Sequence, residues 1–202
     1  MTNISLFKKS LYIFLVFSTF LFTSVSNSKE PINFIKEVTA EASGILATNI
    51  SKDAKILKLR ELAEKTVDIK GVGYYSLGKH RKKISKNELI EYEKLFKEYF
   101  LKSFSSRLSE YSDPKINVLS QDILSEKYTM VSSILVASEK RPEIKIEWRV
   151  YTKNKERPLI RDLIIEGLSL ARTQKEEFNS IIQNNDGDIN ALFNALEKFT
   201  SE

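Results

Sequence analysis

Cysteine is absent from the 202-residue chain, and histidine occurs only once, as His80. Without cysteine the chain has no disulfide, no thiolate metal ligand and no cysteine nucleophile. A single histidine excludes a metal site built from several histidines, and it excludes a serine–histidine relay elsewhere in the chain. These absences weaken the hypothesis of an enzyme more than any residue that is present.

A strong charge of one sign is also missing. The chain has 32 basic and 27 acidic residues, a formal net charge of +5. The first 28 residues contain two of the basic residues and none of the acidic ones, so the remainder carries +3. A surplus this small gives neither a basic stripe for nucleic acid nor a strong steering field. We therefore expect no nucleic-acid partner.

The apolar run near the N-terminus, from Leu11 to Phe22, follows two lysines and precedes several serines. This order is typical of a signal peptide. The alternative is a retained membrane anchor, but the run has 12 residues, whereas a spanning helix needs about 20. We predict a cleaved signal peptide over residues 1–28, with cleavage after Ser26 or Ser28.

Residues 29–202 contain no internal repeat and no low-complexity linker, so they predict one domain. Such a domain buries roughly 70% of the surface of its unfolded chain. Apolar residues recur at helical spacing in four successive segments, which begin near Pro31, Ser51, Asp68 and Ser85. The last segment is the longest, and Ser85 with Glu88 forms a capping box at its start.

After Pro114 the apolar period changes from 3.6 to 2, which indicates strands. Four strands are expected, over Lys115 to Leu119, Tyr128 to Val136, Ile144 to Val150 and Leu159 to Ile165. Two more helices follow, beginning at Ser169 or Thr173 and at Asp188. The predicted fold class is α+β, with helices packed on one face of a curved four-stranded antiparallel sheet.

A sheet that curves away from its helices encloses an apolar space, where such folds often bind small molecules. The candidate lining residues are apolar side chains of the inner sheet face and of two helices: Leu77, Phe96, Phe100, Val131, Leu135, Ile144, Ile146, Trp148, Val150, Leu163 and Ile165. A filled core explains the same stripe, because periodicity alone does not distinguish the two. Both interpretations stay open at this point.

A basic turn surrounds the single histidine, with Lys79, Arg81, Lys82 and Lys83 on either side of His80. These charges predict contact with an anionic headgroup or with a partner. A solvated connector between helices is the alternative, because charge runs are usually solvated.

Two acids and a glycine stand near the end of the last expected strand. Asp162 and Glu166 lie on the strand face opposite Leu163 and Ile165, where they form either a general-acid pair or a charged outer face with ion pairs to arginines. Gly167 fits either an anion-binding turn or a tight turn from strand to helix.

Several segments carry a family resemblance that covers nearly all of residues 29–202. They are Asp68 to Gly78 with the basic turn, Phe96 to Tyr111, Trp148 to Val150, Arg161 to Leu170, Glu177 with Phe178, and Gly187 to Leu192. In order and spacing they resemble the MlaC family, also called toluene-tolerance proteins. The chain departs from the family pattern at Arg81, at Pro158 and Leu159, and at Lys175.

The resemblance implies a sheet related to nuclear-transport-factor-like and cystatin-like folds, with a deep pocket for phospholipid acyl chains. It implies a soluble periplasmic carrier, not an enzyme, that shuttles lipid between the outer and inner membranes and maintains outer-membrane lipid asymmetry. The expected cargo is phospholipid, with no cofactor and no metal. The expected partners are an inner-membrane ABC transporter complex with its lipid-binding ring domain and an outer-membrane lipoprotein–porin complex.

Two other functions remain open from the residues themselves. One is a pocket enzyme of related fold that acts on a small hydrophobic substrate, which needs an acid or base inside the pocket. The other is an envelope binding or scaffold module with a filled core.

Overall fold

The computed structural model describes residues 29–139 and 141–202, so the expected signal peptide lies outside the described residues. The N-terminal half is helical, with α1 (Pro31–Ala47), α2 (Lys52–Thr66), α3 (Ile69–Leu77), the short 3₁₀ helix η1 (Gly78–Lys82) and α4 (Lys86–Leu108). In this described part, no helix is both long enough and apolar enough to cross a membrane.

The sheet follows, with β1 (Ile116–Ser125), β2 (Tyr128–Leu135), β3 (Ile144–Tyr151), β4 (Leu159–Ile165) and β5 (Leu168–Ser169). All neighbours are antiparallel, and the spatial order β1-β2-β3-β4-β5 is the chain order. Two helices end the chain, α5 (Leu170–Gln183) and α6 (Ile189–Ser201). The predicted mixed fold with an open antiparallel sheet is confirmed. The structure adds the two-residue β5 and continues β1 beyond Leu119 to Ser125.

The helices begin where the sequence predicts them. Ser51, Asp68, Ser85, Ser169 and Asp188 each accept a hydrogen bond from a backbone amide of the first turn. These bonds satisfy amides that have no partner inside the helix. The capping box at the start of α4 is complete. Of the two candidates for the start of α5, Ser169 is the cap.

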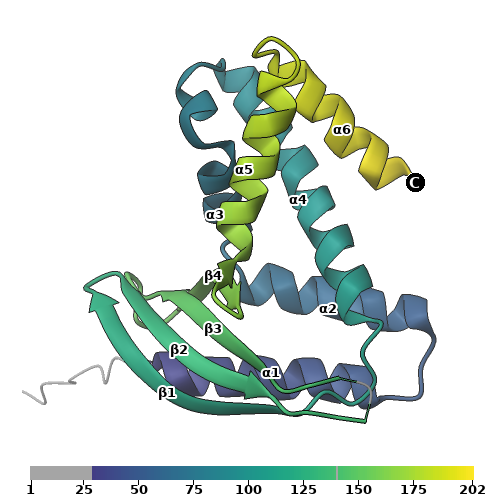
Figure 1. Cartoon of the computed structure of the whole chain (residues 1–202), viewed down its shortest axis with the longest axis vertical. Coiled ribbons are helices and arrows are strands. Elements are labelled where there is room, and N and C mark those ends of the chain that lie inside the picture. Colours follow the sequence, from purple (N-terminus) through teal and green to yellow (C-terminus); the bar gives the residue numbers. More distant parts are fainter. Residues whose placement is uncertain (1–28, 140) are drawn as a thin grey trace, which may run out of the picture.

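The helices divide into one that lies along the sheet and several that stand away from it (Figure 1). Helix α1 packs against β1 and β2, whereas α3 and α5 meet the sheet at β4. Helices α4 and α6 pack on each other, and α4 also packs on α2 and α3. A single cluster of apolar side chains runs from the sheet through the helices.

The inner face of the sheet is the one that carries Trp148 of β3. The strand register places Val131 of β2 and Leu163 of β4 directly beside it. One residue, Arg161, is skipped between the β4 partners of Arg149 and Val150, so Ile160 returns to the inner face beside Val150. The other face is half-exposed over β2 and β3, as an alternating pattern predicts.

Strand β1 is an edge of the sheet and contains two register shifts. They leave Leu119 and Leu124 as extra residues without a direct partner on β2. Bulges of this kind bend an edge strand and turn side chains outward. Both leucines are exposed.

Candidate apolar binding site

Ten of the eleven predicted pocket-lining side chains belong to the single apolar cluster, and Ile165 lies half-buried outside it. Seven are buried, namely Leu77, Phe96, Val131, Leu135, Ile146, Trp148 and Val150. Phe100, Ile144 and Leu163 are half-buried against them. The structure thus brings residues from α3, α4 and three strands together. Their contact with a ligand stays a prediction.

Exposure differs between two parts of the inner face over β2 to β5. Thr129, Val150 and Ile160, which we call the closed row, pair side by side and are 0–4% exposed. The opposite part of this face, which we call the open corner, consists of the half-buried Ile144, Leu163 and Ile165 and of Leu168. Leu168 pairs with Ile165, shares its face and is 60% exposed. The apolar inner face therefore reaches solvent at the β4–β5 corner, and also on the edge strand β1, where Ile123 pairs with Thr129 and is 80% exposed.

Helix α4 contributes a ladder of three phenylalanines to the same cluster. The ring centroids of Phe96 and Phe100 are 6.2 Å apart, and those of Phe100 and Phe104 are 5.7 Å apart. Phe96 is buried, but Phe100 and Phe104 are half-buried. Both the sheet and α4 therefore carry large apolar groups that are incompletely covered.

The buried polar atoms of the inner sheet face are paired with each other. The indole Nε1 of Trp148 donates to the hydroxyl of Ser133 at 2.8 Å, and that hydroxyl donates to the carbonyl of Ile146 at 3.2 Å. A satisfied network of this kind removes the cost of burying the groups. The hydrogen bond restrains the orientation of the indole ring, whose remaining atoms are apolar.

The carboxylate of Asp162 is buried, which differs from the exposed outer strand face predicted for it. It accepts hydrogen bonds from the Ser169 hydroxyl at 2.6 Å and from the Ala171 amide at 3.0 Å. Arg149 lies 3.4 Å away, which is the ion pair expected with an arginine. The start of α5 covers this side of β4, and a negative charge at a helix N-terminus is favourable. Asp162 therefore fixes the corner between β5 and α5.

Glu166 and Gly167 form the turn between β4 and β5, with backbone φ angles of +49° and +82°. A positive φ suits glycine because it has no Cβ. The predicted turn thus leads first to a short strand and only then to the helix. This reversal places Leu168 beside Ile165 on the inner face.

A second tie joins the sheet to the helices on the side of the closed row. Arg161 donates to Asp68 at 2.7 Å through Nε and to the Tyr128 hydroxyl at 2.7 Å through Nη1. Its guanidinium also stacks 3.6 Å from the ring centroid of Tyr151. Asp68 in turn donates its amide to the carbonyl of Ile160. This geometry anchors the start of α3 to β4.

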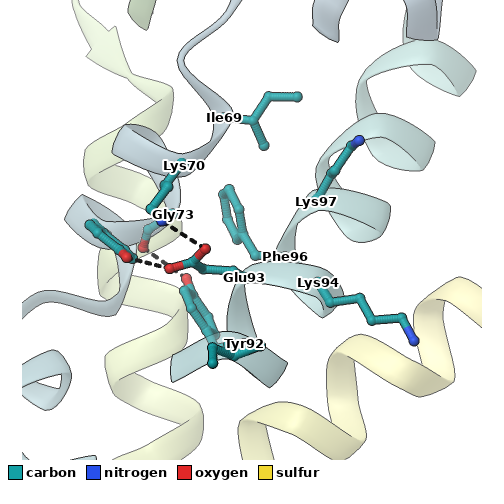
Figure 2. Close-up of a pocket in the computed structure, with 10 residues that line it drawn as sticks. Ile69, Lys70, Gly73, Tyr92, Glu93, Lys94, Phe96 and Lys97 are labelled. Atoms are coloured by element: carbon teal, nitrogen blue, oxygen red, sulfur yellow. Dashed lines mark hydrogen bonds and ion pairs between the residues drawn. The ribbon is translucent and has the colours of Figure 1, made fainter. Parts of the chain in front are cut away.

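A hollow of about 410 Å³ lies between α3 and α4, and Phe96 is the predicted pocket residue that lines it. Figure 2 shows Glu93 directed toward Lys70, while Lys94 and Lys97 extend away. Burial alone would raise the pKa of Glu93, but hydrogen bonds from Tyr74 and Lys70 outweigh it and hold the pKa below its ordinary value. The carboxylate is thus a paired anion at the rim.

The basic turn lies on η1, apart from the inner face of the sheet. Lys79, Arg81, Lys82 and Lys83 are all exposed there. His80 is buried, with its Nε2 atom 3.1 Å from the side-chain oxygen of Asn179 on α5. Because α3 starts at β4 and rises about 1.5 Å per residue, the basic turn follows the far end of a helix about 14 Å long.

Sequence reasoning missed Phe104 and Leu168 as parts of the candidate site. Phe104 follows Phe100 by four residues, a spacing that places the two on one side of the helix. Leu168 belongs to a two-residue strand, which leaves no alternation to detect. Among the described residues, no group of three His, Asp or Glu side chains could hold a metal ion.

Comparisons with known proteins show a family match and a structural match. A family model described as "MlaC protein" matches residues 36–198. A phospholipid-binding protein from Ralstonia solanacearum, solved in complex with a phospholipid, has a similar structure with a TM-score of 0.72. Its sequence identity is 14%, and the match covers 86% of this chain and 98% of that chain. No curated protein matches the sequence. The structural match shows a shared fold.

Proposed function

Because this chain belongs to the MlaC family, we propose that it binds phospholipid without covalent chemistry and carries it through the periplasm between the inner and outer membranes. In this role the protein is not an enzyme and maintains the lipid asymmetry of the outer membrane. The phospholipid complex of the structurally similar protein from Ralstonia solanacearum supports a phospholipid cargo. The signal peptide expected over residues 1–28 supports export.

The observation that carries the proposal is the graded exposure of the inner sheet face. A filled core is covered on all sides, yet this apolar face continues from the closed row to Leu168, which is 60% exposed. Phe100 and Phe104 on α4 are incompletely covered as well. We place the acyl chains along Leu163 and Ile165, between the sheet and α4, with the headgroup outside the open corner.

The energetics favour such a carrier. Burying one methylene group gains about 0.8 kcal/mol, so an acyl chain of ordinary length gains on the order of 10 kcal/mol when it leaves water. A free phospholipid therefore does not cross an aqueous gap at a useful rate. Side chains that are only half-buried in the lipid-free protein can contact acyl chains at little cost in free energy. The acyl chains then displace no packed side chains of the core. No catalytic group is needed for this step.

We assign the basic turn to a partner. The position of Lys79, Arg81, Lys82 and Lys83 after the far end of α3, whose start is at β4, supports a partner contact over a headgroup contact at the open corner. Four exposed cations suit an acidic surface. The resemblance supports an inner-membrane ABC transporter complex with its ring domain and an outer-membrane lipoprotein–porin complex as the partners.

The direct test is the lipid content of the exported protein, purified without detergent. We expect phospholipid to co-purify, as measured by mass spectrometry of an organic extract. Removing the lipid should lower the melting temperature, and adding phospholipid should restore it, because a ligand that binds the folded state stabilises it. A protein that carries no lipid, takes up none from vesicles and melts unchanged is a scaffold instead.

Two variants locate the site. Leu163→Asp places a charge on the proposed acyl path and should abolish lipid retention, because burying an unpaired carboxylate against an acyl chain is costly. Leu57→Asp is the matched control, since Leu57 lies on α2 and is 62% exposed. Equal lipid content in both variants contradicts the placement. Chemically altered lipid in the extract would instead favour the enzyme.

A further inference from the structure

One end of the sheet carries a surface that the proposed lipid site does not use. The turn between β1 and β2 and the loop between β3 and β4 lie side by side there, because the Thr152 amide donates to the carbonyl of Lys127 at 2.9 Å. In Figure 1 this is the end of the sheet where the arrow of β1 finishes. We call residues 123–127 and 152–157 together the sheet tip.

The sheet tip exposes two large apolar side chains. Ile123 is 80% exposed and Leu124 is 53% exposed. Their exposure follows from the fold. The side-chain oxygen of Gln121 accepts the amide of Ile32, so α1 begins level with Gln121 and leaves the end of β1 uncovered. The second bulge of β1 then turns Leu124 outward.

Basic residues stand beside these apolar side chains. Lys153, Lys155 and Arg157 are exposed in the β3–β4 loop, where Glu156 is the one acid. Lys127 is exposed in the neighbouring turn, which also has the acid Glu126. The positive charge is therefore concentrated in the β3–β4 loop, which lies beside the β1–β2 turn, whereas the exposed acid Asp122 directly precedes Ile123.

We propose that the sheet tip docks on the surface of a membrane rich in anionic phospholipid, with Ile123 and Leu124 inserted at the level of the headgroups. Peripheral membrane contacts combine inserted apolar side chains with basic residues that face anionic lipids. The basic turn on η1 is richer in charge, but large aliphatic side chains are not exposed within it. The sheet tip has both components. This contact is independent of whether the interior holds lipid.

The test is co-sedimentation of the full exported protein with vesicles at low salt. We expect binding to vesicles of phosphatidylcholine and phosphatidylglycerol in equal parts and at least about tenfold weaker binding to phosphatidylcholine alone, since each basic residue near an anionic surface strengthens binding about fivefold. Raising the salt should weaken the binding, because exposed charges are screened.

Two variants test the residues. The double variant Ile123→Ser with Leu124→Ser should bind anionic vesicles about tenfold more weakly, because two apolar side chains no longer leave water. The double variant Lys153→Glu with Lys155→Glu should lose binding by more than that, because it also adds repulsion. The matched control is Leu57→Ser, whose side chain on α2 is 62% exposed and distant in sequence from the sheet tip.

Several outcomes overturn the inference. The inference is wrong if the unaltered protein does not bind anionic vesicles. It is also wrong if the sheet-tip variants bind these vesicles as strongly as the control variant does. Loss of a dimer in the Ile123 and Leu124 variant, with vesicle binding unchanged, would assign the surface to a second copy of the chain. Lipid content, measured on the same samples, reports separately on the proposed carrier function and should stay unchanged.

Discussion

The closed row and the open corner are two parts of one sheet face, and they differ in how their side chains are covered. Thr129, Val150 and Ile160 are buried, and they lie beside the hydrogen bond between Arg161 and Asp68. Leu168, at the other part, has solvent on one side. Both parts are mostly apolar, so the sequence pattern alone does not separate them. The difference teaches that one stripe of a sheet can be tightly packed in one part and open to solvent in another, and our proposal places lipid binding in the open part.

The largest effect is expected in the closed row. Ile160→Ala removes a side chain that is 3% exposed, and the cavity should lower the free energy of unfolding by about 2–5 kcal/mol. Urea denaturation measures this loss. A loss below about 1 kcal/mol would mean that this end of the face is as loosely packed as the other, and the comparison would fail.

The next largest effect is expected at the joint that holds the open corner in place. Asp162→Ala leaves the buried hydroxyl of Ser169 and the amide of Ala171 without their acceptor, which should cost about 1–3 kcal/mol. Hydrogen exchange of the Ala171 amide should become faster, while the amide of Asp68 stays protected. Equal acceleration at both amides would contradict a local role for Asp162.

A smaller effect on stability, with a larger one on binding, is expected at the open corner. Leu168→Ser changes an exposed side chain and should alter the free energy of unfolding by less than about 0.5 kcal/mol. The amount of co-purifying phospholipid should nevertheless fall, because the acyl path loses its outermost apolar group. If Leu168→Ser lowered the free energy of unfolding as much as Ile160→Ala does and still retained its lipid, the difference between the open corner and the closed row would be contradicted.

The smallest effect is expected outside both regions. The pKa of Glu93 is lowered in the folded state, so its contribution to stability is present at neutral pH and is lost as the pH falls through the folded pKa. Tyr74→Phe removes one of the hydrogen bonds that lower this pKa. The variant should be slightly less stable than the unaltered protein at pH 7, and the gap should close on acidification below about pH 4. Lipid content should not change.

The sequence predicts most of this fold because its signals are local. Polar caps such as Ser85 and Asp188 mark the helix starts, and alternation in Ile144 to Val150 marks a strand. The register was not predictable in the same way. A skipped residue at Arg161 and a two-residue strand at Leu168 depend on contacts with distant segments, which a local pattern does not contain. The candidate site followed the same division, since the members on regular strands and helices were predicted and Leu168 on the two-residue strand was not.

The burial of Asp162 has the same origin. In a regular strand with Leu163 and Ile165 facing inward, Asp162 faces the opposite side, which predicts an outward carboxylate. The first turn of α5 returns over this side of β4 and supplies Ser169 and Ala171 as donors. A polar residue in a strand is therefore exposed to solvent only if no later helix or strand covers it and supplies hydrogen-bond partners.

The two bulges of β1 have a consequence for how the protein behaves at high concentration. An exposed sheet edge is a template on which a strand of another molecule can add, and continued addition leads to aggregation. Here one edge is interrupted at Leu119 and Leu124, and the other is the two-residue β5. Neither edge offers a long regular row of free amides and carbonyls. Removing residue 119 or 124 would straighten β1. The deletion should therefore shorten the time to fibril formation, although it adds no apolar side chain.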